Sequence, residues 1–183
     1  MDAVRGPDSI CPTVDFPAEA QPDVILTRLV ETYQTALLRI CYMILRDEAL
    51  AEDAVQETFL KAYKALHTFR GESGEKTWLF RIGVNVCRDM RRGRWFRYID
   101  RRVTPETLPI PAAEAEEEHL DLSRAIHQLK DRDKEIILLY YYQNMNIRDI
   151  AQTLDLAPSS VSNRLTKART HLKNLLERGE HHG

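Results

Sequence analysis

Apolar residues recur at helical spacing along the first half of the chain, and this periodicity limits the possible fold more than any other feature. In residues 24–45 the steps between them alternate between four and three, as on one face of an amphipathic helix. A second series follows Asp47, a good helix cap, and runs to about residue 67, and a third covers residues 78–90. No strand-like alternation occurs in the first 96 residues. The sequence therefore predicts an all-α fold whose first domain, residues 24–96, contains three helices. The residues expected to face inward are Leu26, Val30, Tyr33, Leu37, Ile40, Ile44, Ala51, Val55, Phe59, Ala62, Leu66, Trp78, Ile82, Val86 and Met90.

The interval 97–119 lacks this periodicity and contains Pro105, Pro109 and Pro111. Residues 103–121 hold six acidic side chains and no basic one. Such a composition predicts a flexible, exposed acidic linker. Four further helical segments are expected beyond it, at about 120–129, 131–143, 146–154 and 158–176, and they form a second small domain over residues 120–178. Residues 1–23 are expected to be a disordered extension and residues 179–183 a short tail.

Basic residues are concentrated in the third predicted helix and just beyond it. Residues 61–102 carry 12 basic and 4 acidic side chains. Arg81, Asn85, Arg88 and Arg92 are four, three and four residues apart, so they form one polar stripe. Arginines then alternate with aromatic residues at 94–98, a combination that suits single-stranded DNA because cations bind the backbone and rings stack on bases. A solvated basic face beside core aromatics is the alternative that the pattern leaves open.

The second predicted domain contains a short helix, a tight turn and a longer helix. Asn146 is a favourable cap with Asp149 three residues later, and Pro158 suits the first position of the next helix. Asp155 stands in the turn where glycine is usual. Asp adopts the left-handed backbone conformation of such a turn more readily than most residues. This arrangement is typical of a helix-turn-helix that inserts its second helix into a DNA major groove. A helical hairpin for protein contact is the alternative. The inward positions of the second helix are Val161, Leu165, Ala168, Leu172 and Leu175, and the outward ones are Ser160, Asn163, Arg164, Lys167 and His171.

Other functional classes find little support in the sequence. Cys11, Cys41 and Cys87 are widely spaced without neighbouring His, so they indicate buried apolar positions rather than a disulfide framework, a metal site or a redox sensor. The carboxylates at 48, 52 and 53 have no nearby His that would suggest an enzyme. No apolar run is long enough to span a membrane, and residues 1–21 do not resemble a signal peptide. We therefore expect a cytoplasmic protein that is neither an enzyme nor a membrane protein and has no cofactor, metal ion or small-molecule substrate.

Several motifs together resemble a known family. The segments AEDAVQETFLKAY at 51–63, FRGES at 69–73 and TWLFRIGVN at 77–85 are similar to the second conserved region of extracytoplasmic-function sigma factors. NIRDIA at 146–151 and SVSNRLTKAR at 160–169 are similar to their fourth region. The resemblance covers about residues 24–96 and 120–177, in the order of that family. It implies an alternative sigma factor that binds core RNA polymerase and directs promoter recognition, DNA melting and transcription initiation.

The resemblance also implies particular roles and partners. The partners are the clamp helices of the largest polymerase subunit, the beta flap, promoter DNA and an anti-sigma factor. The linker would pass through the active-site channel of the polymerase, where an acidic segment fits a site for nucleic acid. The polymerase-binding residues would be Asp53, Gln56, Glu57 and Lys61. The minus-ten DNA-binding residues would be Phe69, Arg70, Ser73, Lys76, Trp78, Arg81, Asn85, Arg88, Arg91 and Arg92. The minus-thirty-five DNA-binding residues would be Ser159, Ser160, Asn163, Arg164, Lys167, Arg169 and Lys173.

Two residues depart from the family pattern. Glu75 stands where the family often has an aromatic or apolar residue, and Ser162 replaces a frequent basic residue. Two rival functions remain: a helix-turn-helix regulator that binds DNA without core polymerase, and an RNA-binding protein that uses the basic third helix. Promoter binding by the chain alone, rather than only with core polymerase, would favour the first rival.

Overall fold

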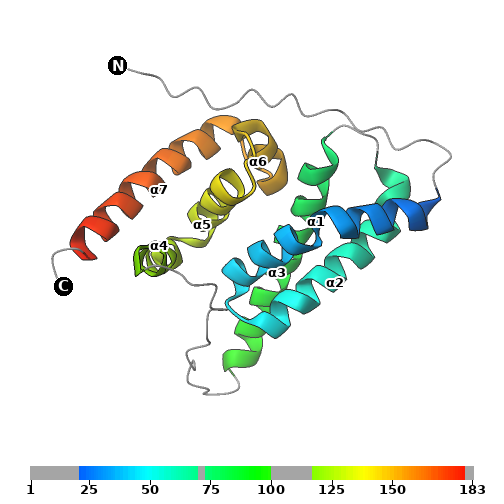
Figure 1. The fold of residues 1–183 in the computed structure, drawn as a ribbon, viewed down its shortest axis with the longest axis horizontal. Coiled ribbons are helices and arrows are strands. Elements are labelled where there is room, and N and C mark those ends of the chain that lie inside the picture. Colours follow the sequence, from blue (N-terminus) through cyan, green and yellow to red (C-terminus); the bar gives the residue numbers. More distant parts are fainter. Residues whose placement is uncertain (1–20, 70–72, 100–116, 180–183) are drawn as a thin grey trace.

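The computed structural model describes residues 21–69, 73–99 and 117–179, and within these ranges all regular structure is helical (Figure 1). The first half comprises α1 (Pro22–Leu45), α2 (Glu48–Ala65), a short 3₁₀ turn (Leu66–Thr68) and α3 (Glu75–Ile99). The second half comprises α4 (Glu117–Gln128), α5 (Asp131–Ile137), a π-helical turn (Leu138–Tyr142), α6 (Ile147–Leu154) and α7 (Pro158–Gly179). The prediction of an all-α fold with three helices followed by four is confirmed.

The local signals at the helix ends act as expected. The Asp47 carboxylate accepts a hydrogen bond from the Leu50 amide at 3.0 Å and so caps α2. Asn146 caps α6 in the same way through the Asp149 amide, at 2.9 Å. Asp155 ends α6 in the left-handed conformation, with φ of 55°, and α7 starts at Pro158. The turn between α6 and α7 is therefore formed without glycine.

Two helix boundaries differ from the sequence-based expectation. Helix α3 continues to Ile99, beyond the expected end at 96, and α4 starts at Glu117 rather than near 120. The residues between them, 100–116, lie outside the described ranges, as do the extension at 1–20 and the tail at 180–183. The boundaries differ because the apolar pattern indicates only the packed part of a helix. The backbone hydrogen bonds of a helix can continue beyond that part.

The segment expected to be one helix from 131 to 143 contains a change of helix type. Helix α5 ends at Ile137 and the next five residues form a π-helical turn. Leu138 and Leu139 remain buried, whereas Tyr141 and Tyr142 lie partly in solvent. The wider turn carries no sequence signal of its own, because π-helical and α-helical residues have similar preferences and tertiary packing selects between them.

The core of the first half differs in detail from the expected one. On α1 the inward positions Leu37, Ile40 and Ile44 are buried as predicted, but nearer its start Ile25 and Leu29 are buried instead of their neighbours. On α3 the expected positions Trp78, Ile82 and Met90 are only half-buried. The buried apolar side chains of α3 are those of Leu79, Phe80, Val84, Val86 and Cys87.

The reason is that α3 packs on two sides. It lies against α1 and α2 within the first half and also against α6 of the second half, so the two halves are side by side (Figure 1). A helix covered on two sides no longer shows a single apolar stripe. No sequence pattern predicted this contact between the halves.

The cysteines of the first half belong to its core. Cys41 on α1 and Cys87 on α3 are both buried. A hydrogen bond with Cys41 and burial both raise the pKa of the Cys87 thiol. This confirms the interpretation of these two residues as buried, while Cys11 lies outside the described residues.

The glycines of α3 allow a test of this packing. A Cβ on Gly83 would lie 2.7 Å from Cδ1 of the buried Leu37, whereas a Cβ on Gly93 would meet no described atom within 4 Å apart from its chain neighbours and the backbone of its own helix. We expect Gly83→Ala to lower the free energy of unfolding by about 1 kcal/mol, because the core must shift. Gly93→Ala should raise it by about 0.5–1 kcal/mol through helix propensity. Thermal and urea unfolding of both variants would measure this, and equal shifts in one direction would contradict the close approach of α1 and α3.

Candidate nucleic-acid interface

Helices α6 and α7 form the helix-turn-helix expected from the sequence. Ala151 on α6 is buried, and Val161, Leu165, Ala168 and Leu172 form the buried side of α7. The opposite side of α7 is in solvent, and at its start Arg164 donates a hydrogen bond from Nη1 to Asp133 Oδ1 of α5 at 2.9 Å. Of the residues expected to bind the upstream element, Ser160 is half-buried, and the exposed ones are Ser159, Asn163, Arg164, Lys167, Arg169 and Lys173.

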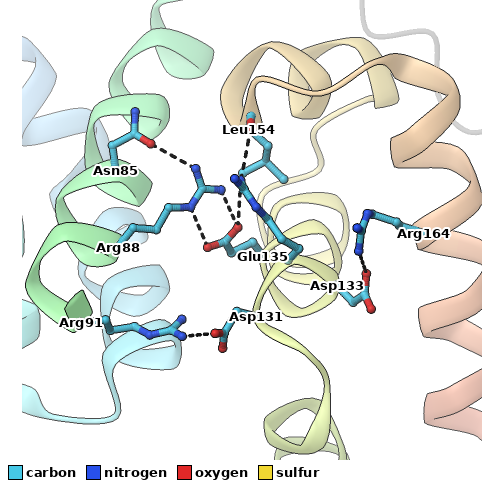
Figure 2. Close-up of polar contacts among 9 residues, drawn as sticks. Asn85, Arg88, Arg91, Asp131, Asp133, Glu135, Leu154 and Arg164 are labelled. Atoms are coloured by element: carbon cyan, nitrogen blue, oxygen red, sulfur yellow. Dashed lines mark hydrogen bonds and ion pairs between the residues drawn. The ribbon is translucent and has the colours of Figure 1, made fainter. Parts of the chain in front are cut away.

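The polar stripe of α3 faces the second half of the chain. Arg88 donates to both oxygens of Glu135 on α5, from Nε at 3.0 Å and from Nη2 at 2.5 Å (Figure 2). Arg91 donates to the Asp131 carboxylate at the start of the same helix. Arg88 also donates to Asn85 Oδ1 at 3.1 Å. Helix α5 therefore covers Arg88 of the stripe and the neighbouring Arg91.

Arg92 behaves differently from its neighbours on the stripe. It pairs with Asp89 of its own helix, and three-quarters of its side chain is exposed. The side chains of residues 94–99 lie outside the part that the structure describes, so the interleaved aromatics at 95, 96 and 98 are not placed.

The residues that lead into α3 also lie near the second half. Phe69 and Trp78 pack with ring centroids 5.0 Å apart. Lys76 donates from Nζ to the backbone oxygen of Gln143 at 2.6 Å and lies over the Phe80 ring at 5.8 Å. Ser73 is half-buried, and Arg70 falls outside the described ranges.

Asp149 of α6 lies beside this segment. Burial raises the pKa of Asp149, and a hydrogen bond from Thr77 together with the Lys76 charge opposes that effect. The carboxylate is therefore held near the start of α3 by groups of the other half.

Glu75, which departs from the family pattern, has a structural role. Its carboxylate is buried at the start of α3 and accepts two hydrogen bonds from the Arg28 guanidinium of α1, one of them 3.0 Å long between Nη1 and Oε1. This contact raises the pKa of Arg28. The pair ties the start of α3 to α1, and a carboxylate in the first turn is also favoured by the helix dipole. The sequence marked the position as unusual but contained no signal that its partner is Arg28.

The residues expected to contact polymerase lie on the outside of α2. Asp53, Gln56 and Lys61 are exposed, and Glu57 is half-buried and lies 3.5 Å from Lys61. Two apolar side chains on the same helix, Leu60 and Tyr63, are 47% and 40% exposed. Charged groups beside exposed apolar groups are typical of a protein interface.

Tyr63 makes one further contact. Its hydroxyl donates to Asp23 Oδ1 at 3.0 Å, which raises the pKa of Tyr63.

A hollow of about 740 Å³ lies between α3 and the start of the helix-turn-helix. It is lined by Arg81 and Asn85 from one half and by Arg148, Gln152 and Asp155 from the other. Nε of Arg81 is buried and has no hydrogen-bond partner among the described residues. Two guanidinium groups and a single carboxylate favour an anion over a cation. Within the described ranges, no cluster of His, Cys, Asp and Glu side chains could hold a metal ion.

Among the described residues, no helix combines the length and the apolar composition that a membrane span requires.

Both halves match models of known protein regions. Residues 29–97 match sigma-70 region 2, and residues 119–172 match sigma-70 region 4. The chain is 31% identical over 159 residues to the RNA polymerase sigma factor NccH of Alcaligenes xylosoxydans, covering 82% of this chain and 86% of that protein. It is 29% identical to the RNA polymerase sigma-H factor of Pseudomonas aeruginosa, covering 81% and 84% of the two chains.

Solved structures agree with these matches. The sigma factor RpoE of Bartonella quintana, solved with the anti-sigma factor NepR, matches with a TM-score of 0.74 and 26% identity over 84% of this chain and 97% of that one. CnrH, solved with the cytosolic domain of CnrY, matches with a TM-score of 0.66 and 26% identity over 85% and 90% of the two chains.

The helix-turn-helix, the basic α3 and the two matched regions define a bacterial-type transcription initiation factor, and the chain belongs to the sigma-70 family. Within that family it is an extracytoplasmic-function sigma factor, the group named in relatives such as SigM of Bacillus subtilis, to which it is 26% identical over 84% of its length. This confirms the resemblance read from the sequence.

One half-buried histidine near the contact between the halves allows a pH test. Burial, together with the Arg46 and Lys134 charges, lowers the pKa of His127 to about 4. In the unfolded chain it titrates near 6.5, so between these values the unfolded state binds the extra proton and stability falls as the pH decreases from about 6.5 to 4. We expect His127→Gln to reduce the loss of unfolding free energy between pH 7 and pH 4.5 by about 1–2 kcal/mol, allowing for partial exposure. Urea unfolding at both pH values measures it, and identical losses in variant and parent would contradict the assignment.

Proposed function

We propose that this sigma factor binds core RNA polymerase through α2, holds the melted minus-ten strand on α3 and the segment before it, and reads the minus-thirty-five element with α7. The observation that carries the proposal is the exposed polar side of α7, with an asparagine and an arginine near its start and three further cations along it. In helix-turn-helix proteins this part of the second helix enters the major groove.

The contact with polymerase is assigned to α2 on the basis of exposure and composition. Its outer side carries Asp53, Gln56, Glu57 and Lys61 together with the exposed Leu60. An apolar centre with a charged surround is a common design for a stable protein contact. The family relation supports the clamp helices of the largest subunit as the partner, and the beta flap as the partner of the second half.

The assignment to the minus-ten strand rests on the arginines of α3 and on the aromatic pair before it. Arginine binds phosphate through paired donors, and Phe69 and Trp78 offer ring faces that suit an unstacked base. The full set is Phe69, Arg70, Ser73, Lys76, Trp78, Arg81, Asn85, Arg88, Arg91 and Arg92.

Control by an anti-sigma factor is part of the proposal. The RpoE structure similar to this chain was solved with the anti-sigma factor NepR, and the CnrH structure was solved with the cytosolic domain of CnrY. The proposal also holds that the protein catalyses no reaction itself and acts in the cytoplasm, where bacterial RNA polymerase works.

Transcription with purified components tests the proposed function. Core polymerase with this protein should start transcripts from cognate promoters found by sequencing transcript starts, and neither component should do so alone. Promoter binding by the chain without core would favour a simple helix-turn-helix regulator, and binding of RNA without either would favour the RNA-binding alternative.

The α2 assignment predicts a charge-dependent loss of core binding. Asp53→Lys and Glu57→Lys should each weaken binding to core polymerase by about tenfold, because each places a repulsive charge in a complementary interface. Glu31→Lys, which makes the same charge change on the exposed side of α1, should bind within about twofold of the parent. Titration of core with fluorescently labelled protein gives these values. Equal losses in all three variants would show that net charge, rather than α2, governs binding.

The α7 assignment predicts that specificity and affinity separate along the helix. Arg164→Ala should cost about 1–3 kcal/mol at the preferred minus-thirty-five sequence and relax the choice of base there. Lys173→Ala should weaken all sequences about equally, since a phosphate contact carries no base information. Selection from a randomised upstream element by each holoenzyme at fixed salt distinguishes the two effects. A uniform loss with Arg164→Ala and changed bases with Lys173→Ala would mean that α7 enters the groove in another orientation.

A further inference from the structure

Arg164, near the start of α7, is held by an acidic side chain from another helix. Its Nη1 donates to Oδ1 of Asp133 on α5 at 2.9 Å (Figure 2). The Asp133 side chain is 20% exposed and that of Arg164 is 45% exposed. Both residues belong to the second half of the chain, so the contact is internal to the part that contains the helix-turn-helix. The pair lies at the edge of the proposed minus-thirty-five surface.

The sequence of α7 places Arg164 beside α5. Leu165 follows it directly and Val161 precedes it by three residues, and both of these apolar side chains are buried. Arg164 therefore stands where the outward side of α7 meets its packed side. Residues 158–176 include no acidic side chain, so this part of α7 offers Arg164 no carboxylate of its own. The partner has to come from a neighbouring helix.

Asp133 is itself fixed in position. It lies in the first turn of α5, where the helix dipole favours a negative charge. Ile136 and Ile137 of the same helix are buried, and α5 packs against α7. A carboxylate on a packed helix restricts the guanidinium that it binds, whereas a solvated arginine samples many rotamers. The contact therefore orders Arg164 before any DNA is bound.

The contact leaves one edge of the guanidinium available. Among the described residues, no hydrogen bond engages Nε or Nη2 of Arg164. Two neighbouring N–H donors of an arginine can donate in parallel to O6 and N7 of a guanine in the major groove. An arginine held through Nη1 thus keeps a pair of donors that can read guanine.

A carboxylate at this place also has a cost. A negative charge beside the groove repels the DNA phosphates and lowers the affinity for every sequence. The pair formed by Lys173 and Glu177 shows the contrast, because both side chains are exposed and lie four residues apart on the same helix. Such a pair orients its members little. Asp133 comes from a different, packed helix, and what it can add to DNA binding is orientation.

We infer that Asp133 is a positioning residue for promoter recognition: by holding Nη1 of Arg164, it directs the Nε and Nη2 edge toward a guanine of the minus-thirty-five element and increases the preference for guanine at that position. The inference rests on the proposed function, because it takes α7 to be the helix that reads this element. Asp133 itself contacts no base. It acts by reducing the conformational entropy that Arg164 loses on binding.

Selection from a randomised upstream element, by holoenzymes that carry Asp133 variants, tests this inference at fixed salt. Arg164→Ala first identifies the position that Arg164 reads, and the parent should prefer guanine there. Asp133→Ala should lower this preference for guanine by about five- to tenfold, and Asp133→Asn, which keeps the shape without the charge, by about threefold. Asp133→Glu restores the carboxylate and should retain the preference within about twofold. Base preferences at the other positions should stay as in the parent.

Two comparisons separate positioning from a purely structural effect. In an Arg164→Ala background, Asp133→Ala should change no base preference further, because no guanidinium remains to be oriented. Glu177→Gln removes an acid beside Lys173 on α7 and should leave the base preferences unchanged. A change of base preference by Asp133→Ala that persists without Arg164 would show that the substitution disturbs the second half as a whole, and it would overturn the inference.

The sign of the effect excludes a simple covering role. If Asp133 merely covered Arg164, Asp133→Ala would raise the affinity for all upstream sequences equally and keep the guanine preference. That outcome would overturn the inference, as would a parent preference for another base at the position that Arg164 reads.

These outcomes are distinct from failure of the proposed function. If core polymerase and this protein together start no transcription, the proposed function fails. If transcription starts and Arg164→Ala relaxes one position, but the Asp133 variants select the same bases as the parent, the positioning role alone is wrong.

Discussion

The packing of α3 on two sides is the constraint on which the arrangement of the other helices depends. One side, with Leu79, Val84 and Cys87, contributes to the core with α1 and α2, and the start of the helix contacts α6. Gly83 allows Leu37 to approach closely, and Glu75 ties the start of the helix to Arg28. Because α3 also carries the arginine stripe, the residues that fix its position determine where those arginines point.

The charged side chains at the contact between the halves are shielded from water, and this burial determines how they pair and titrate. Glu135 is nearly buried and is compensated by Arg88, and Arg132 lies close to the same carboxylate. Lys134 has a lowered pKa, chiefly because burial removes water from the ammonium group, and the Arg46 and Arg91 charges add to this effect against the opposing Asp131 and Glu135 carboxylates. The contact between the halves is therefore polar, and each buried charge is compensated by the charged side chains around it. Polar contacts between domains open more readily than apolar ones.

The two surfaces that are proposed to bind DNA differ in how exposed they are. On α7 the outward residues are exposed along the helix, and Arg164 is the one that Asp133 engages. On α3 the central arginines are held by α5, while Asn85 and Arg92 remain exposed. In this arrangement the proposed upstream-element surface on α7 is exposed while the proposed strand-binding surface on α3 is partly covered.

The sequence by itself determined the helices, the caps at Asp47 and Asn146, the turn at Asp155 and the side of α7 that faces outward. These features depend on periodicity and on short-range hydrogen bonds, which involve residues within four positions of one another. The tertiary structure alone decided that Glu75 pairs with Arg28, that Arg88 pairs with Glu135, and that Trp78 and Ile82 are only half-buried. Each of these features depends on a contact between helices that are distant in the chain. The sequence does not indicate whether a charged side chain is solvated or pairs with a residue 47 positions away.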